Sequence, residues 1–176
     1  MIISVEKAKA LIDFGDWTDE KIEMKLRAVE QTIRAYTNNN FQNRGHRCTA
    51  DIVDGAFVVG SAVPFAVGDT VQVSESGLNG GLFTVSYVDG STFTTDESTV
   101  DEKAVLCTKI TYPADVVDCC VNLLEWEKQN RAKVGIQSET LSRHSVTYFN
   151  QDSANQVMGY PVSLLGCLKA YRKARC

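Results

Sequence analysis

Residues 82–95 read LFTVSYVDGSTFTT, and this stretch indicates most directly how the chain folds. Apolar and polar side chains alternate on both sides of Asp89-Gly90, and a period of two is typical of a half-buried strand. An Asp-Gly pair between two alternating runs favours a tight connection, because such turns need positive φ angles. The stretch therefore predicts a β-hairpin.

The same alternation extends in both directions, from about Cys48 to Ile110. Turn-forming residues divide this region into five expected strands, at 56–60, 70–74, 82–88, 92–95 and 105–110. Five short strands in one short region predict a small, strongly twisted antiparallel barrel or sandwich.

Helical patterns precede the β region. A short helix is expected after Ser4 and a longer one from Thr18 to about residue 37. Both residues are good N-caps, and apolar residues then recur at steps of three and four. The run Asn38-Asn39-Asn40 is expected to end the longer helix, because asparagine tolerates the left-handed conformation of a helix C-cap.

Helical patterns also follow the β region. Two further helices are expected to begin at Pro113 and Pro161, because proline suits the first turn of a helix. Between them, residues 136–149 are expected to form an irregular extended arm and residues 152–159 a polar loop.

These patterns together predict an α+β protein. Amphipathic helices are not stable alone in water, so the helices before and after the β region are expected to pack together. The expected fold is a bundle of about four helices with an inserted small antiparallel β-barrel or sandwich. Residues 1–47 and 111–176 would form one discontinuous helical domain, and residues 48–110 the inserted β domain.

Composition excludes several classes of function. The 176 residues carry 18 Lys and Arg against 22 Asp and Glu, a formal net charge of -4, which disfavours a general basic nucleic-acid binder. No apolar run approaches the ~18 residues of a membrane-spanning helix. The first residues lack the pattern of a signal peptide, so we expect a protein made and kept in a cytosol, without a membrane partner.

The six cysteines are expected to be free thiols. They are too dilute for a disulfide scaffold and include no C-x-x-C pair. Cys48 and Cys107 lie near the two ends of the β region, so pairing of its first and last strands would make their thiols neighbours. Only His46 and His144 accompany the cysteines, so no structural zinc site and no other metal or cofactor is predicted.

No catalytic constellation is visible either. The chain lacks the nucleophile-elbow, P-loop, dinucleotide-binding and zinc-protease motifs. Residues 77–81 are rich in glycine, but they join two expected strands and precede no helix, which favours a hairpin loop over an anion cradle. The acids between residues 96 and 102 lack the spacing of a calcium loop and are expected to be solvated.

Charge is distributed unevenly along the chain. Residues 48–112 hold nine acids and only two lysines, whereas the last 16 residues hold four basic side chains and no acid. Lys169, Arg172 and Lys173 recur at helical steps near the apolar residues Leu168 and Tyr171. These cations either complement the dipole at a helix C-terminus, worth about 0.3–1 kcal/mol, or dock onto an acidic protein or a phosphate backbone.

Five segments in order carry a further pattern: the short helix at 5–12, the helix end AYTNNNF at 35–41, the helix opened by Tyr112-Pro113 and closed by Trp126-Glu127, the stretches IQSETLS and SVTY between 136 and 148, and the final helix from Tyr160-Pro161 to Tyr171-Arg172. In this order they resemble the head–tail connector (adaptor, or head completion) family of tailed bacteriophages. The inserted β region departs from the compact, all-helical members of that family, and the resemblance does not imply its role.

The resemblance implies a structural virion protein that is not an enzyme. Such connectors form a ring, commonly a dodecamer, under the portal protein at the capsid vertex. The ring extends the DNA channel and provides the platform for a stopper or tail-terminator protein. Packaged DNA would pass through the lumen without specific binding. The protein would be assembled in the host bacterial cytoplasm and lie in the neck of the virion.

The resemblance also implies a docking site. The family's C-terminal segment binds the portal, which makes the implied contact residues Leu168, Lys169, Tyr171, Arg172, Lys173 and Arg175. A head-to-tail ring contact suits a subunit with unlike acidic and basic surfaces, because the two sides of each subunit must differ.

Two other classes of function stay open. A small β-barrel can be a binding module for nucleic acid or peptide, and the region contains the aromatic residues Phe57, Phe65, Phe83, Tyr87 and Phe93. Its excess of acids argues against nucleic acid. A thiol-dependent enzyme would require one cysteine far more reactive than the others.

Overall fold

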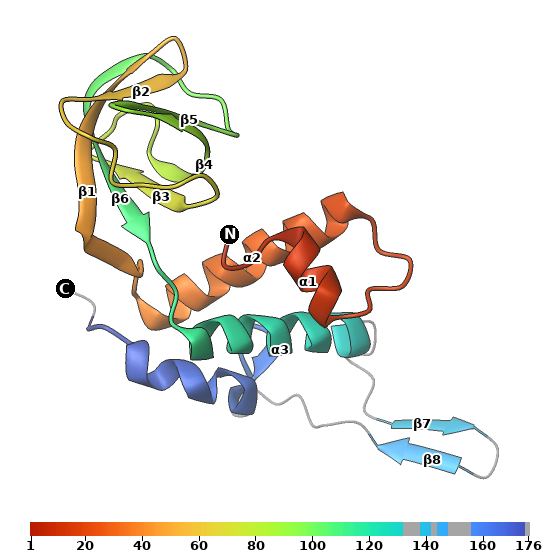
Figure 1. The fold of residues 1–176 in the computed structure, drawn as a ribbon. Helices are drawn as coiled ribbons and strands as arrows, with labels where there is room; N and C mark the ends of the chain where they lie inside the picture. Colours follow the sequence, from red (N-terminus) through yellow and green to blue (C-terminus); the bar gives the residue numbers. More distant parts are fainter. Residues whose placement is uncertain (132–137, 142–143, 148–155, 175–176) are drawn as a thin grey trace. The chain divides into compact units, whose positions relative to one another are not determined.

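The computed structural model describes residues 1–131, 138–141, 144–147 and 156–174 (Figure 1). The chain divides into two compact units. Met1–Asn39 and Pro113–Cys176 form the first, which we call the helical unit, and Asn40–Tyr112 forms the second, which we call the barrel unit. The expected domain boundary after residue 47 falls within the first strand, and the one after residue 110 falls at the end of the last barrel strand.

The barrel unit is a closed antiparallel barrel. Its six strands are β1 (Gln42–Val53), β2 (Ala56–Val59), β3 (Thr70–Ser74), β4 (Gly81–Asp89), β5 (Thr92–Thr95) and β6 (Glu102–Ile110). They are arranged in the order β1-β2-β5-β4-β3-β6, and β6 pairs with β1 to close the barrel.

The predicted hairpin at 82–95 is confirmed. Strands β4 and β5 pair antiparallel, with Asp89 opposite Thr92. The two residues between them are Gly90 and Ser91, and Gly90 has a φ of 55°. The glycine therefore occupies the turn position where a residue with a Cβ atom would be strained.

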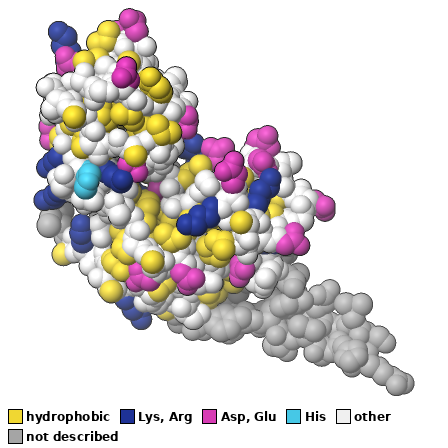
Figure 2. Space-filling model, in the orientation of Figure 1, with side chains coloured by type: hydrophobic (Ala, Val, Ile, Leu, Met, Phe, Trp, Pro, Cys, Tyr) yellow, Lys and Arg dark blue, Asp and Glu magenta, His cyan; other side chains and the backbone are white. Residues whose placement is uncertain are grey.

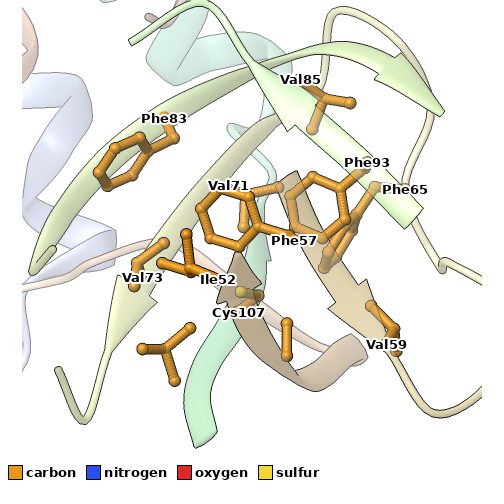
Figure 3. Close-up of a cluster of buried hydrophobic side chains, with 12 residues drawn as sticks. Ile52, Phe57, Val59, Phe65, Val71, Val73, Phe83, Val85, Phe93 and Cys107 are labelled. Atoms are coloured by element: carbon orange, nitrogen blue, oxygen red, sulfur yellow. The ribbon is translucent and has the colours of Figure 1, made fainter. Parts of the chain in front are cut away.

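Aromatic and branched side chains fill the barrel (Figure 3). Phe57 on β2 lies opposite Phe93 on β5, and their rings stack with centroids 4.5 Å apart. The rings of Phe65 and Phe93 are nearly perpendicular, with centroids 5.4 Å apart. Phe57 and Phe93 are at most 1% exposed, so they form the centre of this core.

The helical unit contains the α-helices α1 (Val5–Leu11), α2 (Asp19–Thr37) and α3 (Ala114–Asn130), the 3-10 helix η2 (Val162–Tyr171), and the short strands β7 (Ser138–Leu141), β8 (His144–Thr147), β9 (Gln156–Val157) and β10 (Tyr160–Pro161). α3 packs against both α2 and η2 (Figure 1). Strands β7 and β8 form one hairpin and β9 and β10 another.

The predicted caps of α1 and α2 are confirmed. The side chain of Ser4 accepts a hydrogen bond from Lys7 N, and that of Thr18 accepts one from Lys21 N, so both are N-caps. Asn38 closes α2 in the left-handed conformation, with a φ of 48°. Each cap satisfies backbone groups that the helix itself leaves without a partner.

The expected fold class is wrong. In the described residues the largest regular element is a closed six-stranded antiparallel barrel, which about four helices accompany, so the chain is not a helical bundle with an inserted small barrel. The sequence-based prediction of five strands omitted β1, because the first half of β1 exposes polar side chains and shows no alternation of apolar and polar residues. The expected final α-helix is the 3-10 helix η2, and Gly166 within it lowers the helical propensity.

The expected irregular regions contain regular structure as well. Within residues 136–149, the described parts form the β7–β8 hairpin. Within residues 152–159, the described residues 156–159 form β9 and the turn to β10. The remaining residues of both stretches lie outside the described part of the chain. In that described part, no helix has the length and apolarity that crossing a bilayer requires.

Candidate functional site

The C-terminal segment, the main candidate from the sequence, is bound to the end of α2 within the helical unit. Lys173 N donates to Thr37 O at 2.8 Å. The side-chain amide of Asn38 donates to Ala174 O at 2.9 Å, and that of Asn39 donates to Tyr171 O at 3.2 Å. The polar residues that terminate α2 therefore also hold the segment that follows η2.

The implied contact residues take different positions along this segment. Leu168 has no exposed surface and belongs to the core of the helical unit, so it is not available to a partner in this conformation. The Tyr171 hydroxyl donates to both carboxylate oxygens of Asp115 at 2.7 Å, and this bond raises the pKa of Tyr171. Arg175 lies outside the described residues.

The exposed members are Lys169, Arg172 and Lys173, and we call these three the C-terminal basic surface. The Arg172 guanidinium lies over the Tyr36 ring, 5.3 Å from its centroid. A cation held over an aromatic ring has fewer conformations to lose when it binds a partner. This surface is therefore basic, accessible and partly ordered in advance.

A buried carboxylate that the sequence analysis did not single out lies elsewhere in the helical unit. Glu127 on α3 is 3% exposed. Lys25 Nζ lies 2.9 Å from its Oε2, the Tyr160 hydroxyl donates to its Oε1 at 2.8 Å, and the Arg131 guanidinium bonds the same oxygen. Each carboxylate oxygen therefore has at least one charged or hydroxyl donor.

These contacts set the protonation of Glu127. Burial alone would raise the pKa of Glu127, but hydrogen bonds from Arg131, Lys25 and Tyr160 outweigh it and hold that pKa at about 2. A carboxylate that stays ionised at neutral pH does not serve as a general acid. Through its bonds to Lys25, Arg131 and Tyr160, Glu127 joins α2, the end of α3 and β10.

Glu127, Lys25 and Arg131 also line a cleft of about 310 Å³. Its walls are Trp17, Lys21, Lys25, Glu127, Lys128 and Arg131. Two of the ammonium groups contact neutral groups: Lys21 Nζ lies 4.4 Å from the centroid of the Trp17 ring, and Lys128 Nζ donates to Asp13 O. Four cations against one carboxylate make the cleft electropositive, although Figure 2 shows both signs of charge on the visible surface of the helical unit.

A signal for this cluster is present in the sequence. Glu127 continues the apolar stripe of α3, and a charged residue at such a position needs a buried partner. Lys21 and Lys25 are four residues apart, and Lys128 and Arg131 three apart, so each pair shares one helix face. The spacing could have indicated two basic helix faces, but it could not show that they meet at one carboxylate.

The glycine-rich loop at 77–81 is a hairpin loop, as predicted, because it joins the paired strands β3 and β4. Its donors bind a carboxylate of the barrel itself. Glu102 on β6 accepts hydrogen bonds from Ser76 Oγ at 2.5 Å, Gly77 N at 2.6 Å and Asn79 Nδ2 at 2.8 Å. These bonds, the one from Ser76 above all, hold the pKa of Glu102 at about 2.

Other acids of the barrel also accept hydrogen bonds from the backbone. Thr84 N donates to Glu97 at 2.9 Å, and Asp54 N donates to Asp101 at 2.9 Å. Across the described ranges, no three His, Cys, Asp or Glu side chains are grouped so that they could hold a metal ion. His46 is exposed on β1; His144 lies in β8.

The barrel aromatics bear on the nucleic-acid interpretation. Four of the five, Phe57, Phe65, Phe83 and Phe93, are buried in the barrel core, and Tyr87 alone of these is exposed, at 60%. Stacking on bases requires exposed rings. The pattern that suggested a stacking surface therefore marks the core.

No protein-family model matches this chain, and no curated protein matches it. Its function is therefore inferred from its surfaces and from the motifs in its sequence.

We expect Glu127→Gln to destabilise the helical unit. The neutral amide leaves Lys25 and Arg131 without their carboxylate, which we expect to lower the free energy of unfolding by roughly 2–3 kcal/mol at pH 7. Urea unfolding followed by tryptophan fluorescence measures this, because Trp17 and Trp126 lie beside the cluster. Glu125→Gln, on the same helix, is the matched control, and equal stability of the two variants would contradict the structural role of Glu127.

We expect Glu102→Gln to weaken the barrel in a pH-dependent way. The folded pKa of about 2 lies below the ordinary value of 4.5, so the ionised carboxylate stabilises the fold fully above about pH 4.5. That stabilisation is lost as pH falls towards 2. The denaturation midpoints of Glu102→Gln and of the unmodified protein, measured from pH 7 to pH 2, should therefore differ most at pH 7 and converge at low pH. The control variant Glu75→Gln should have the same midpoints as the unmodified protein throughout. A difference independent of pH would count against this assignment.

Proposed function

We propose that this protein is a structural, non-enzymatic head–tail connector (adaptor) of a tailed bacteriophage. Its copies form a ring under the portal at the capsid vertex, extend the DNA channel and provide the platform for a stopper or tail-terminator protein. The observation that supports this most is the C-terminal basic surface, since it coincides with the portal-docking segment implied by the sequence motifs.

The local structure of that surface suits docking. Three hydrogen bonds hold residues 171–174 against the end of α2, while the cations of Lys169, Arg172 and Lys173 stay exposed. A segment that is already ordered loses less entropy on binding, and clustered cations accelerate encounter with an acidic surface. The proposed partner surface on the portal is therefore acidic.

Charge also supports a ring of identical subunits. The barrel unit holds nine acidic and four basic side chains, whereas the helical unit presents the C-terminal basic surface and the electropositive cleft. A head-to-tail contact joins two different surfaces of the same chain, and opposite charges on them favour that contact. The net charge of -4 is consistent with DNA passing the lumen without specific binding.

The alternative function is a barrel that binds nucleic acid or peptide. A closed small barrel is compatible with it. The buried aromatics and the excess of acids make it the weaker proposal. Salt-dependent binding of the full chain to DNA would support it against the connector.

Charge reversal tests the connector proposal better than truncation, because truncation would also remove the core residue Leu168. We expect the triple variant K169E/R172E/K173E to fold normally and to bind the portal protein of the same phage at least ~10-fold more weakly, since each reversed charge repels an acidic surface. Binding is measured by interferometry, and ring formation by electron microscopy of the mixture with portal. The control variant K7E/K103E should bind and form rings like the unmodified protein.

Two results would count against this proposal. Unchanged portal binding by the triple variant would exclude the C-terminal basic surface as the docking site. Absence of any ring in the presence of portal, for the unmodified protein, would exclude the connector function itself.

A further inference from the structure

Two thiols face each other where the barrel closes. The first and last strands pair, and Cys48 on β1 lies directly opposite Cys107 on β6, which confirms that the two cysteines are neighbours. Cys107 has no exposed surface and points into the barrel core (Figure 3), and the half-buried Cys48 packs against the same core.

The backbone at this position suits a disulfide. Residues directly opposite in an antiparallel pair have Cα atoms about 4.5–5.5 Å apart, and disulfides span Cα separations of about 4.4–6.8 Å. The neighbouring pairs Arg47–Thr108 and Thr49–Leu106 continue the same register. The thiols therefore need no shift of register to reach each other.

The two thiols are chemically unequal. The Cys107 thiol donates a hydrogen bond to Cys48, which lowers the pKa of Cys48 and raises the pKa of Cys107. The thiolate is the attacking form in disulfide exchange, and access to solvent decides which cysteine reacts first. Cys48 therefore suits the first attack. Once its sulfur is part of a mixed disulfide, it no longer carries the charge that raises the pKa of Cys107, and Cys107 is the neighbouring thiol that can make the second attack.

We propose that Cys48 and Cys107 are a modification site at which a low-molecular-weight disulfide, such as glutathione disulfide, converts two thiols into a disulfide. The Cys48 thiolate attacks one sulfur of the small disulfide, forms a mixed disulfide and releases one small thiolate. Cys107 loses its proton to water and attacks the Cys48 sulfur, which releases the second small thiolate. Two protein thiols are oxidised, one small disulfide is reduced to two thiols, and the released thiolates take up the two protons.

The bond would join the strands by which the chain enters and leaves the barrel. Nearly the whole barrel lies between residues 48 and 107, so the crosslink would close that loop and restrict the unfolded chain. The crosslink is separate from the proposed connector function and does not depend on it.

A second thiol pair competes for the same oxidant. Cys119 on α3 and Cys167 on η2 both point at the carbonyl of Leu164, with sulfur–oxygen distances of 3.4 and 3.7 Å, and Cys167 is exposed. A test must therefore distinguish the barrel pair from this pair in the helical unit. The variant Cys167→Ser removes the exposed thiol and leaves the barrel unchanged.

The experiment uses the full folded chain. It is incubated with glutathione disulfide, alkylated, digested and analysed by mass spectrometry. We expect a crosslinked peptide that joins Cys48 to Cys107 in the unmodified protein and in Cys167→Ser. The thermal unfolding midpoint of the full chain should rise by roughly 5–15 °C and return after reduction with dithiothreitol.

Two variants serve as controls. Cys48→Ser changes a half-buried position, and Cys107→Ala keeps the core apolar. If one variant fails to fold, the other still serves as the control. Each should lose the crosslinked peptide and the shift of the midpoint. The proposal is overturned if Cys48 stops at the glutathione adduct while Cys107 stays alkylatable after unfolding, or if both remain thiols while Cys119 and Cys167 oxidise.

Discussion

The pairing of β1 with β6 is the contact on which the rest of the fold depends. It closes the barrel, and it also brings together the points where the chain enters and leaves it. Thr111 N donates to Phe41 O at 3.0 Å, and the rings of Phe41 and Tyr112 have centroids 5.0 Å apart. Because the two ends of the barrel unit are fixed side by side, α2 and α3 meet without the entropic cost of closing a long flexible loop. The helical unit can therefore form from two distant parts of the sequence.

Within each unit, a carboxylate with several donors ties elements that are distant in sequence. Glu127 joins α2, α3 and β10, and Glu102 joins β6 to the loop between β3 and β4. Both have a pKa of about 2, because the ionised form accepts more hydrogen bonds than the neutral form could. These two acids therefore hold elements of their own unit together. For this reason, the number of acidic residues in the sequence overstates the negative charge that is free to attract or repel a partner.

Local signals in the sequence predicted local structure well. Asp89-Gly90 predicted a hairpin, Thr18 a helix start and Asn38 a helix end, because each depends on the conformation of a few adjacent residues. The fold class could not be predicted in the same way. The polar half of β1 becomes a strand only because β6 pairs with it, and that pairing spans some 60 residues. For the candidate site, the spacing of the cations was visible, but the burial of Leu168 depends on packing in the helical unit.

The positions of the C-terminal cations limit what the helix dipole can explain. A cation that stabilises a helix through its dipole must lie within the last turn of that helix. Of Lys169, Arg172 and Lys173, only Lys169 lies in the last turn of η2. Arg172 is already extended, with a ψ of 127°, and Lys173 follows it, where its backbone bonds Thr37 instead of η2. The dipole therefore accounts for at most one cation of the C-terminal basic surface. The other two are held beyond the helix end by contacts with α2, and their charges stay exposed, as the proposed docking to an acidic partner requires.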